Sequence, residues 1–480
     1  MIQRAIRWYD YVTINSYWFS LTVRSQTLAS LLVPVLVQQF VGEAAKGTYV
    51  GIIRLWALMV AVLVQALMGI LSDRSTFKWG RRRPFILIGT LIEMFVFAGI
   101  GYISTFDGMS GFWLLFGLYI LSMIASNTAH AATQGLIPDL VPENLRGKFS
   151  GVKVFFDLPL PLIFVSLVIG RMVAAGNIIG ALVVMGLAML AGMALAMFAP
   201  EKPHLQAPSL VDWQPFVRLL VMTGVFAGVI LGSGVSVNWI SNWLSNLPEM
   251  DGALVISAVG LIGMIVAVLV GVWASLTVGL STDLRRENTS FTWWVINRLI
   301  FMVASVNMSA FFVYFLQERF PELAGGKAAG PASTIVMFVG IFILVSSIPS
   351  GFLSDRFGKK TVSMIGSLLG TIGTFGIIFS PSISLMYIGG CLVGIGFGMF
   401  YTSNWALGTT IVPQEEAGRF LGLSNLAGAG AGAIGAYIGG PIGDAIGYTP
   451  LLIIYGLLLL FSILTLIGIQ EPGRTSKASI

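Results

Sequence analysis

The sequence predicts an all-α polytopic membrane protein with two related six-helix bundles and two extra spans between them, fourteen spans in all. Its 480 residues are 56% hydrophobic and only 10% charged, and no soluble core absorbs so much apolar surface. The apolar residues form runs of about 20, the length that an α-helix needs to cross a bilayer. Two short motifs recur in the two halves of the chain, which indicates an internal duplication.

The apolar runs fall into three groups along the chain. Six lie near 13–40, 48–71, 84–104, 111–137, 149–170 and 177–199; two follow near 214–236 and 253–280; six more lie near 291–316, 333–353, 361–380, 384–408, 419–440 and 448–469. We therefore divide the chain into an N-terminal six-helix bundle at 1–200, a cytoplasmic linker with two inserted spans at 201–290, and a C-terminal six-helix bundle at 291–480. An alternative with twelve spans lays 214–236 on the membrane surface, but it misplaces Arg285 and Arg286 unless 253–280 is also not a span.

The repeat rests on two pairs of motifs. GILSDRSTFKWGRRRPF at Gly69 to Phe85 has a shorter counterpart in GFLSDRFGKK at Gly351 to Lys360. VPENLRGKFSG at 141–151 and VPQEEAGRFLG at 412–422 share Val, Pro, Gly, a cation, Phe and Gly at one offset, since 412 − 141 and 422 − 151 are both 271. Two ordered pairs of motifs predict two related halves.

The distribution of cations predicts the orientation in the membrane. A net charge of +6 would suggest nucleic acid as a partner in a soluble protein. Here nineteen of the 27 lysines and arginines fall on one predicted side of the membrane and four on the other. Because positive loops stay in the cytoplasm, we expect both termini to be cytoplasmic, in the cell membrane, with lipid and no nucleic acid as partners.

Several function classes are excluded by what the sequence lacks. Cys391 is the only cysteine and His130 and His204 are the only histidines, so we expect no disulfide framework, no metal site and no cofactor. The chain has no ATP-binding loop of the form GxxxxGK[ST], so energy for any transport should come from an ion gradient. No loop carries the carboxylate cluster that an enzyme would need, and we interpret His130 as a packing residue rather than a proton relay.

Charged residues inside predicted spans are the candidates for substrate binding and proton coupling, because each costs about 2.5–3.5 kcal/mol there. Glu93 has no cation near it in sequence, so a neutral, proton-carrying carboxyl is one interpretation of it. Lys153 and Asp157 stand four residues apart and should pair on one helix face, either for chemistry or as a structural ion pair. Arg24 and its possible repeat partner Arg298 could bind substrate or tie two helices together.

Two prolines predict a break in the fifth span. Pro159 and Pro161 follow Asp157, and neither can donate a helix hydrogen bond. Adding the offset of 271 takes this stretch to three glycines of the second half, at 428, 430 and 432. Interrupted helices at matching positions point to a transporter's central site. We therefore take Pro159, Pro161, Gly428, Gly430 and Gly432 as hinge candidates, with close packing as the alternative for the glycines.

The doubled motif resembles a known pattern. G-x-L-S-D-R followed by G-R-R-R or G-K-K is similar to the signature between spans 2 and 3, and its repeat, in the major facilitator superfamily. The form DR-x5-GRRRPFI at 73–86 resembles the branch of sucrose/proton symporters and glycoside-pentoside-hexuronide-like transporters. GLIPDL at Gly135 to Leu140 resembles the end of span 4 in that branch, which would make Asp139 its transport-linked carboxylate.

The resemblance implies a fold, a mechanism and a set of conformational residues. It implies a monomeric secondary transporter that moves a small solute, a sugar or glycoside, with protons by alternating access. The doubled hinge would latch the two halves together, with the Asp73 carboxylate meeting the start of the span near Gly418. The latch residues are Gly69, Asp73, Arg74, Gly80, Arg81, Arg82, Gly351, Asp355, Arg356, Gly358 and Lys359. Two alternatives stay open: an exporter of drugs or lipophilic metabolites, and a membrane assembly factor that does not transport.

Overall fold

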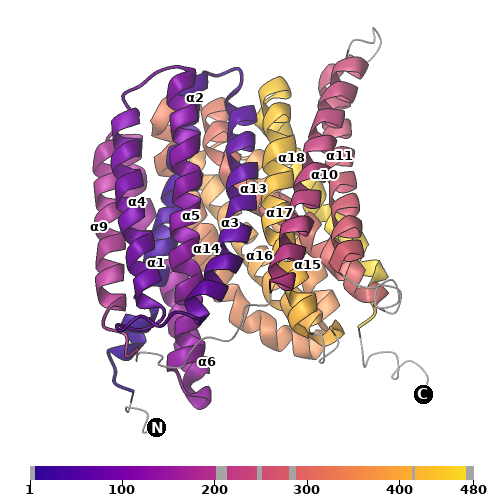
Figure 1. The fold of residues 1–480 in the computed structure, drawn as a ribbon. Coiled ribbons are helices and arrows are strands. Elements are labelled where there is room, and N and C mark those ends of the chain that lie inside the picture. Colours follow the sequence, from indigo (N-terminus) through magenta and orange to yellow (C-terminus); the bar gives the residue numbers. More distant parts are fainter. Residues whose placement is uncertain (1–5, 202–212, 246–250, 280–287, 413–416, 472–480) are drawn as a thin grey trace, which may run out of the picture. The chain divides into compact units, whose positions relative to one another are not determined.

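The computed structural model describes residues 6–201, 213–245, 251–279, 288–412 and 417–471, and every regular element in these ranges is a helix (Figure 1). The first half consists of α1 (Asp10–Thr27) with η1 (Leu28–Leu32) and α2 (Val33–Val41), α3 (Lys46–Asp73), α4 (Arg83–Ile103), α5 (Met109–Leu140), α6 (Glu143–Asp157) with α7 (Pro159–Phe164), η2 (Val165–Ile169) and α8 (Gly170–Ala174), and α9 (Ile178–Ala196). The remainder consists of α10 (Gln214–Ser245), α11 (Gly252–Gly279), α13 (Thr289–Arg319), α14 (Ala329–Phe357), α15 (Lys359–Ile378), α16 (Ile383–Ile411), α17 (Ala417–Ile446) and α18 (Tyr448–Thr465), with short 3-10 turns η3 (Pro321–Leu323), η4 (Gly325–Ala328) and η6 (Leu466–Gly468).

The helices match the predicted spans. Within the described ranges, thirteen helical segments are long and apolar enough to cross a membrane, and each corresponds to one predicted apolar run. The run at 419–440 lies in α17, a helix of 30 residues. The all-α polytopic fold that the sequence predicts is therefore confirmed.

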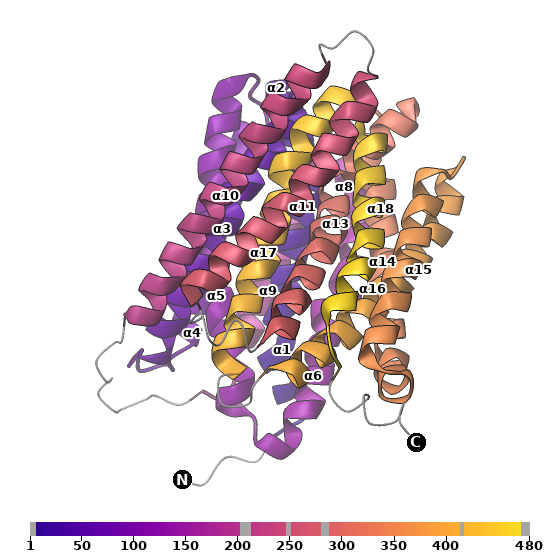
Figure 2. The same cartoon turned by 90° about the vertical axis from the view of Figure 1, so that its right-hand side faces the viewer.

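The helices pack into two compact units. Unit 1 comprises residues 1–41, 60–217 and 325–337, and unit 2 comprises residues 42–59, 218–324 and 338–480. The inserted helix α11 belongs to unit 2, where it packs against α13, α17 and α18, and Figure 2 shows it alongside α17. The inserted pair is thus built into unit 2 through direct helix contacts.

Glycines let the inserted helices approach α17 closely. Phe226 of α10 is 2% exposed, and its ring lies where a Cβ atom on Gly271 or Gly430 would stand, at 2.6 and 2.2 Å. Helix α17 continues unbroken through Gly428, Gly430 and Gly432. The interruption expected at these glycines is therefore not present, because small residues here make room for neighbouring side chains.

The break expected in the first half is present. Helix α6 ends at Asp157, Leu158 leaves the helical region with φ −120° and ψ −73°, and α7 begins at Pro159. A proline at the first helical position needs no intrahelical acceptor, so the chain can restart a helix there. The π-helical turn η2 follows directly. The end of α6 consequently places Asp157 at a helix terminus.

Within unit 2, the first turn of α3 crosses α17 at backbone distance. A Cβ atom on Gly440 would lie 2.1 Å from the Gly47 carbonyl oxygen. One turn along α17, the Asp444 carboxylate accepts hydrogen bonds from the backbone N–H groups of Gly47 (2.8 Å) and Thr48 (2.7 Å). A carboxylate at a helix N-terminus satisfies amides that have no intrahelical acceptor. The crossing therefore joins close packing to a helix cap.

We expect Gly440→Leu to destabilise this crossing by about 1–3 kcal/mol, because any side chain there overlaps the backbone of α3. Thermal unfolding of the purified protein in detergent measures the effect as a lower melting temperature. Gly428→Ala is the matched control on α17, since its Cβ atom would meet the methyl group of Met302 at an ordinary 3.4 Å. Equal melting temperatures for the two variants would contradict the close crossing.

Candidate functional site

A buried ion pair joins three helices of unit 1. Arg24 Nε of α1 lies 3.0 Å from Glu93 Oε1 of α4, and the side chains are 5% and 0% exposed. The Ser122 hydroxyl of α5 donates to both carboxylate oxygens, at 2.9 and 2.8 Å. Arg24 also donates to the Ser122 oxygen, and its guanidinium carbon lies 5.8 Å from the Tyr119 ring centroid. Each charged group therefore has several partners.

Glu93, which has no cation near it in sequence, contacts Arg24 in the structure. The cation comes from α1, far away in sequence, so no local pattern could show it. Arg24 ties α1 to α4 and α5, which is one of the two roles left open for it. Sequence reasoning missed Ser122. Its signal was the polar run Ser122, Ser126, Asn127 and Thr128, which interrupts an otherwise apolar span.

A second ion pair lies in the same unit and is partly exposed. Lys153 Nζ is 3.6 Å from Asp157 Oδ2, and the side chains are 30% and 35% exposed. Their spacing on α6 predicts this contact. The Thr22 hydroxyl of α1 donates to the other Asp157 oxygen at 2.9 Å. Helix α1 thus contributes to both intramembrane ion pairs.

Aromatic and polar side chains surround Lys153. Its ammonium lies 3.7 Å from the Trp18 ring centroid, a cation–π contact. The opposite neighbour of Trp18 is His130, with ring centroids 5.2 Å apart, edge to face, and His130 contacts Gln134 through a 3.2 Å hydrogen bond. The buried Trp18 Nε1 has no hydrogen-bond partner in the structure. His130 packs as expected, beside an indole donor that remains available.

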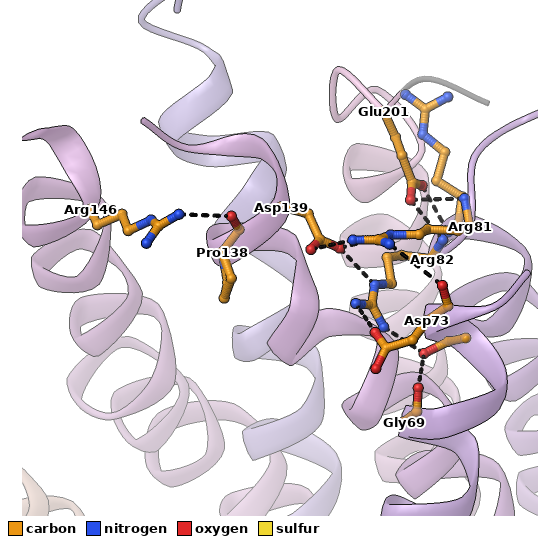
Figure 3. Close-up of polar contacts among 10 residues, drawn as sticks. Gly69, Asp73, Arg81, Arg82, Pro138, Asp139, Arg146 and Glu201 are labelled. Atoms are coloured by element: carbon orange, nitrogen blue, oxygen red, sulfur yellow. Dashed lines mark hydrogen bonds and ion pairs between the residues drawn. The ribbon is translucent and has the colours of Figure 1, made fainter. Parts of the chain in front are cut away.

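The third candidate carboxylate, Asp139, lies elsewhere. It stands in the last turn of α5 and contacts Arg81 Nη2 at 2.5 Å and Arg82 Nε at 2.8 Å. Figure 3 shows both arginines pointing toward it. The structure therefore brings Asp139 together with the first copy of the latch motif, and not with Glu93 and Asp157.

Arg82 is the centre of that latch cluster. Its side chain is 5% exposed and bridges Asp73 at the end of α3 to Asp139. It also donates to the Ser72 hydroxyl at 2.6 Å, and Ser72 in turn donates to the Gly69 carbonyl at 3.1 Å. The remaining first-copy residues, Gly80 and Arg74, lie between α3 and α4, where Gly80 adopts a φ of +113°. The partner expected for Asp73 near Gly418 has side chains outside the described residues.

Glu201 completes this cluster and was not predicted. Its carboxylate accepts from the backbone N–H groups of Arg81 (2.9 Å), Arg82 (2.7 Å) and Arg83 (3.2 Å), so it caps the start of α4. Burial raises the pKa of the Glu201 carboxyl, and these backbone donors oppose that rise.

The second copy of the latch repeats the cap but not the ion pairs. Glu471 accepts from the backbone N–H groups of Lys359 (2.9 Å) and Lys360 (3.4 Å), just after Gly358 with its φ of +95°. The positions of the two capping acids differ by 270, close to the repeat offset, which was the available signal. Gly351, Asp355 and Arg356 lie in the last turns of α14. Asp355 and Arg356 are exposed, and Asp355 forms no ion pair within the described ranges.

Arg298, the last predicted site residue, belongs to unit 2. It lies on α13, with its guanidinium carbon 5.8 Å from the Trp294 ring centroid and 5.2 Å from that of Trp405. Arg24 belongs to unit 1, so the two possible repeat partners have different surroundings: a carboxylate and a hydroxyl for Arg24, two indoles for Arg298.

The membrane-length helices, the ion pairs inside them and the doubled basic hinge define a polytopic membrane protein with charged groups inside its spans. Residues 289–480 match the family model of the Major Facilitator Superfamily. This match covers the second half of the chain, where it includes the second copy of the latch motif.

Known proteins resemble the chain over parts of its length. Sucrose transport protein SUC3 of Arabidopsis thaliana is 34% identical over 117 residues, 20% of this chain and 18% of the relative. The multi-drug resistance efflux pump PmrA of Streptococcus pneumoniae is 30% identical over 155 residues, 30% of this chain and 39% of the relative. The matched stretches thus span well under half of either relative. A crystal structure of a D-xylose-proton symporter shares the fold with a TM-score of 0.62 and 17% identity, over 96% of this chain and 97% of that one.

Proposed function

We propose that this protein is a secondary active transporter that moves a small solute, a sugar or glycoside, coupled to protons by alternating access. The observation that carries this proposal is the Glu93 carboxylate, held within a span between Arg24 and Ser122. A structural ion pair needs only charge balance. If Glu93 carries a proton, Arg24 also needs another hydrogen-bond acceptor while the Glu93 carboxyl is neutral. The Ser122 oxygen already accepts from Arg24 and can keep that cation hydrogen-bonded.

The two ion pairs suit different steps of such a cycle. Asp157 is 35% exposed, whereas Glu93 is fully buried between Arg24 and Ser122, so we expect the two carboxyls to exchange protons at different steps. Protonation of either carboxyl removes its attraction to the paired cation. Protonation of Glu93 would therefore loosen α1 from α4 at Arg24, whereas protonation of Asp157 would release Lys153 of the same helix α6. This links protonation to helix movement.

The proposed transporter has two bundles, cytoplasmic termini and a hinge in its fifth span. The bundles are residues 1–200 and 291–480, joined by the inserted spans at 201–290, and they rock about a central solute. The positive loops place both termini in the cytoplasm and the latch cluster at the cytoplasmic face of the cell membrane. The protein acts as a monomer. Pro159 and Pro161 act as a hinge at the interrupted helix.

A sugar is the preferred solute because the sucrose transport protein is among the relatives and carries the highest identity of those compared. An exporter of drugs or lipophilic metabolites is the second candidate. It is favoured by the efflux pump, whose match covers a larger share of this chain. The two differ in a measurable way, since a symporter takes up protons with a sugar and an exporter expels a lipophilic cation or dye.

Proteoliposomes that contain a pH-sensitive dye test the proposal. Sucrose, maltose and other glycosides are added in turn, and sugar-dependent acidification is expected with the natural protein. The rate of sugar-dependent acidification should fall at least tenfold in Glu93→Gln or in Asp157→Asn, whichever variant lacks the carboxyl that carries the proton. Glu322→Gln is the matched control, because Glu322 is exposed in the short turn after α13.

Acidification that persists in both carboxyl variants would disprove the coupling role of these residues. If no sugar causes acidification and the natural protein expels a dye, the exporter would replace the sugar symporter as the proposed function. In either case the fold and the family-model match over residues 289–480 would stand, since they rest on separate observations.

A further inference from the structure

Arg298 differs from Arg24 and Lys153 in having no carboxylate partner among the described residues. In unit 1, Arg24 pairs with Glu93 and Lys153 pairs with Asp157. Among the residues that the structure describes, none forms an ion pair or a hydrogen bond with the Arg298 side chain, and its Nε is buried without an acceptor. Within the part of the chain that the structure describes, the positive charge of this site is therefore left uncompensated.

The depth of Arg298 makes this absence costly. Arg298 stands nine residues after the start of α13, or about 14 Å along the helix, close to the middle of a bilayer. A cation there costs about 2.5–3.5 kcal/mol on insertion scales. Cation–π contacts recover about 0.5–2 kcal/mol. A charged residue kept at this depth without an acid is therefore a candidate for binding an anionic ligand.

Arg298 lies close to one buried tryptophan, Trp294, and one exposed tryptophan, Trp405. Trp294 is fully buried, its Nε1 donates to the Asn404 carbonyl at 2.8 Å, and its ring fills the place of a Cβ atom on Gly408. Trp405 is 39% exposed. The rigid indole fixes the approach of the guanidinium, and the exposed indole offers a ring face to a ligand.

Hydroxyl groups lie one or two turns away on the same two helices. Tyr401 precedes Trp405 by one turn of α16, and its hydroxyl is 2.9 Å from the Ser305 hydroxyl of α13. Ser305 follows Arg298 by two turns of α13. Arg298, Ser305 and Tyr401 are all half-buried, so each remains partly accessible. The Arg298 guanidinium, the Trp405 ring and the hydroxyls of Tyr401 and Ser305 thus lie along α13 and α16. These four residues are called the Arg298 strip.

We propose that the Arg298 strip binds a monoanionic solute through its carboxylate, with the body of the solute against Trp405 and its polar groups toward Tyr401 and Ser305. A planar guanidinium matches a carboxylate through two parallel hydrogen bonds. One uncompensated positive charge balances one negative charge, which favours a carboxylate over a phosphate carrying about −1.5 to −2. The inference rests on the proposed transport function and adds that the solute is an acid, such as a sugar acid.

Equilibrium binding of radiolabelled glucuronate and glucose to the purified protein in detergent tests this inference. The natural protein should bind glucuronate at least tenfold more tightly than glucose or the methyl ester of glucuronate, which lacks the charge. Arg298→Gln should weaken glucuronate binding at least tenfold and leave glucose binding unchanged. Arg298→Lys should fall between the two, because an ammonium keeps the charge but loses the fork. Arg319→Gln, at the exposed end of α13, is the matched control and should bind glucuronate normally.

The comparison of acid and ester on the natural protein needs no variant, so the inference stays testable if Arg298→Gln fails to fold. Equal affinity for glucuronate and its ester would overturn it, as would competition by inorganic phosphate as strong as that by glucuronate. Proton-coupled glucuronate uptake that does not depend on Arg298 would also overturn it while leaving the proposed function intact. Glucuronate binding that depends on Arg298 without any proton-coupled uptake would support the inference and refute the coupling.

Discussion

Replacing Arg24 by methionine is expected to destabilise the protein by about 3–5 kcal/mol, one of the largest effects of any single substitution in unit 1. Glu93 is fully buried, and without Arg24 its carboxylate would keep only the Ser122 hydroxyl as a partner. An unpaired buried charge retains the full desolvation penalty. The free energy of unfolding, measured in mixed detergent and SDS micelles, reports the loss.

The double variant Arg24→Met with Glu93→Met distinguishes the pair from its parts. Removing both charges together should restore stability to within about 1 kcal/mol of the natural protein, because no group is left uncompensated. Proton-coupled uptake should stay absent in the double variant. Lys153→Met is the matched control: its partner Asp157 is 35% exposed and keeps the Thr22 hydroxyl as a partner, so the expected loss is about 1 kcal/mol or less. A double variant as unstable as Arg24→Met would show that packing, not charge, holds these helices.

The spans and the helix break follow from the sequence because both are local. A bilayer imposes a fixed length on every apolar run, and thirteen of the predicted runs are helices of that length in the described ranges. Pro159 cannot donate a backbone hydrogen bond, so the break between α6 and α7 needs no tertiary information. The contact of Lys153 with Asp157 follows in the same way from helical spacing.

The partners of Glu93 and Asp139 could not be predicted, because they depend on which helices are neighbours. Arg24 reaches Glu93 from another helix, and a resemblance in one short motif placed Asp139 with the coupling carboxylates. In the structure Asp139 instead contacts Arg81 and Arg82. A single sequence shows that a charge needs a partner but not which one it has.

The internal repeat predicts backbone features better than side-chain chemistry. Both halves keep an acid that caps the helix after the hinge, Glu201 in the first and Glu471 in the second. The halves diverge at Pro159 and Pro161, whose counterparts in the second half are glycines. Helix α17 is continuous at Gly430, where the missing side chain leaves room for the Phe226 ring. Caps satisfy backbone groups that every helix start exposes, so they persist, whereas packing follows whichever neighbours a half acquires.

Arg82→Gln is expected to slow transport at least tenfold while leaving solute affinity within about threefold. Arg82 joins the end of α3 to the end of α5 through Asp73, Ser72 and Asp139, from a position that is almost fully buried. Hydrogen bonds to charged groups contribute about 1.5–3 kcal/mol each, and 1.4 kcal/mol of differential stability shifts a conformational equilibrium tenfold. Initial uptake rates and equilibrium solute binding, measured on the same preparation, separate the two effects.

Neighbouring substitutions show why the bridge matters more than the charge. Arg81→Gln removes one contact to Asp139 but leaves Arg82 in place, so it should slow transport only about twofold to threefold. Arg82→Lys keeps the charge, yet an ammonium cannot present the planar fork that reaches two carboxylates and a hydroxyl, and it should be almost as slow as Arg82→Gln. Uptake by Arg82→Lys at the natural rate would mean that a positive charge alone suffices here. Equal losses of binding and uptake in Arg82→Gln would instead place this residue at the solute site, and the latch interpretation of the motif would fall with it.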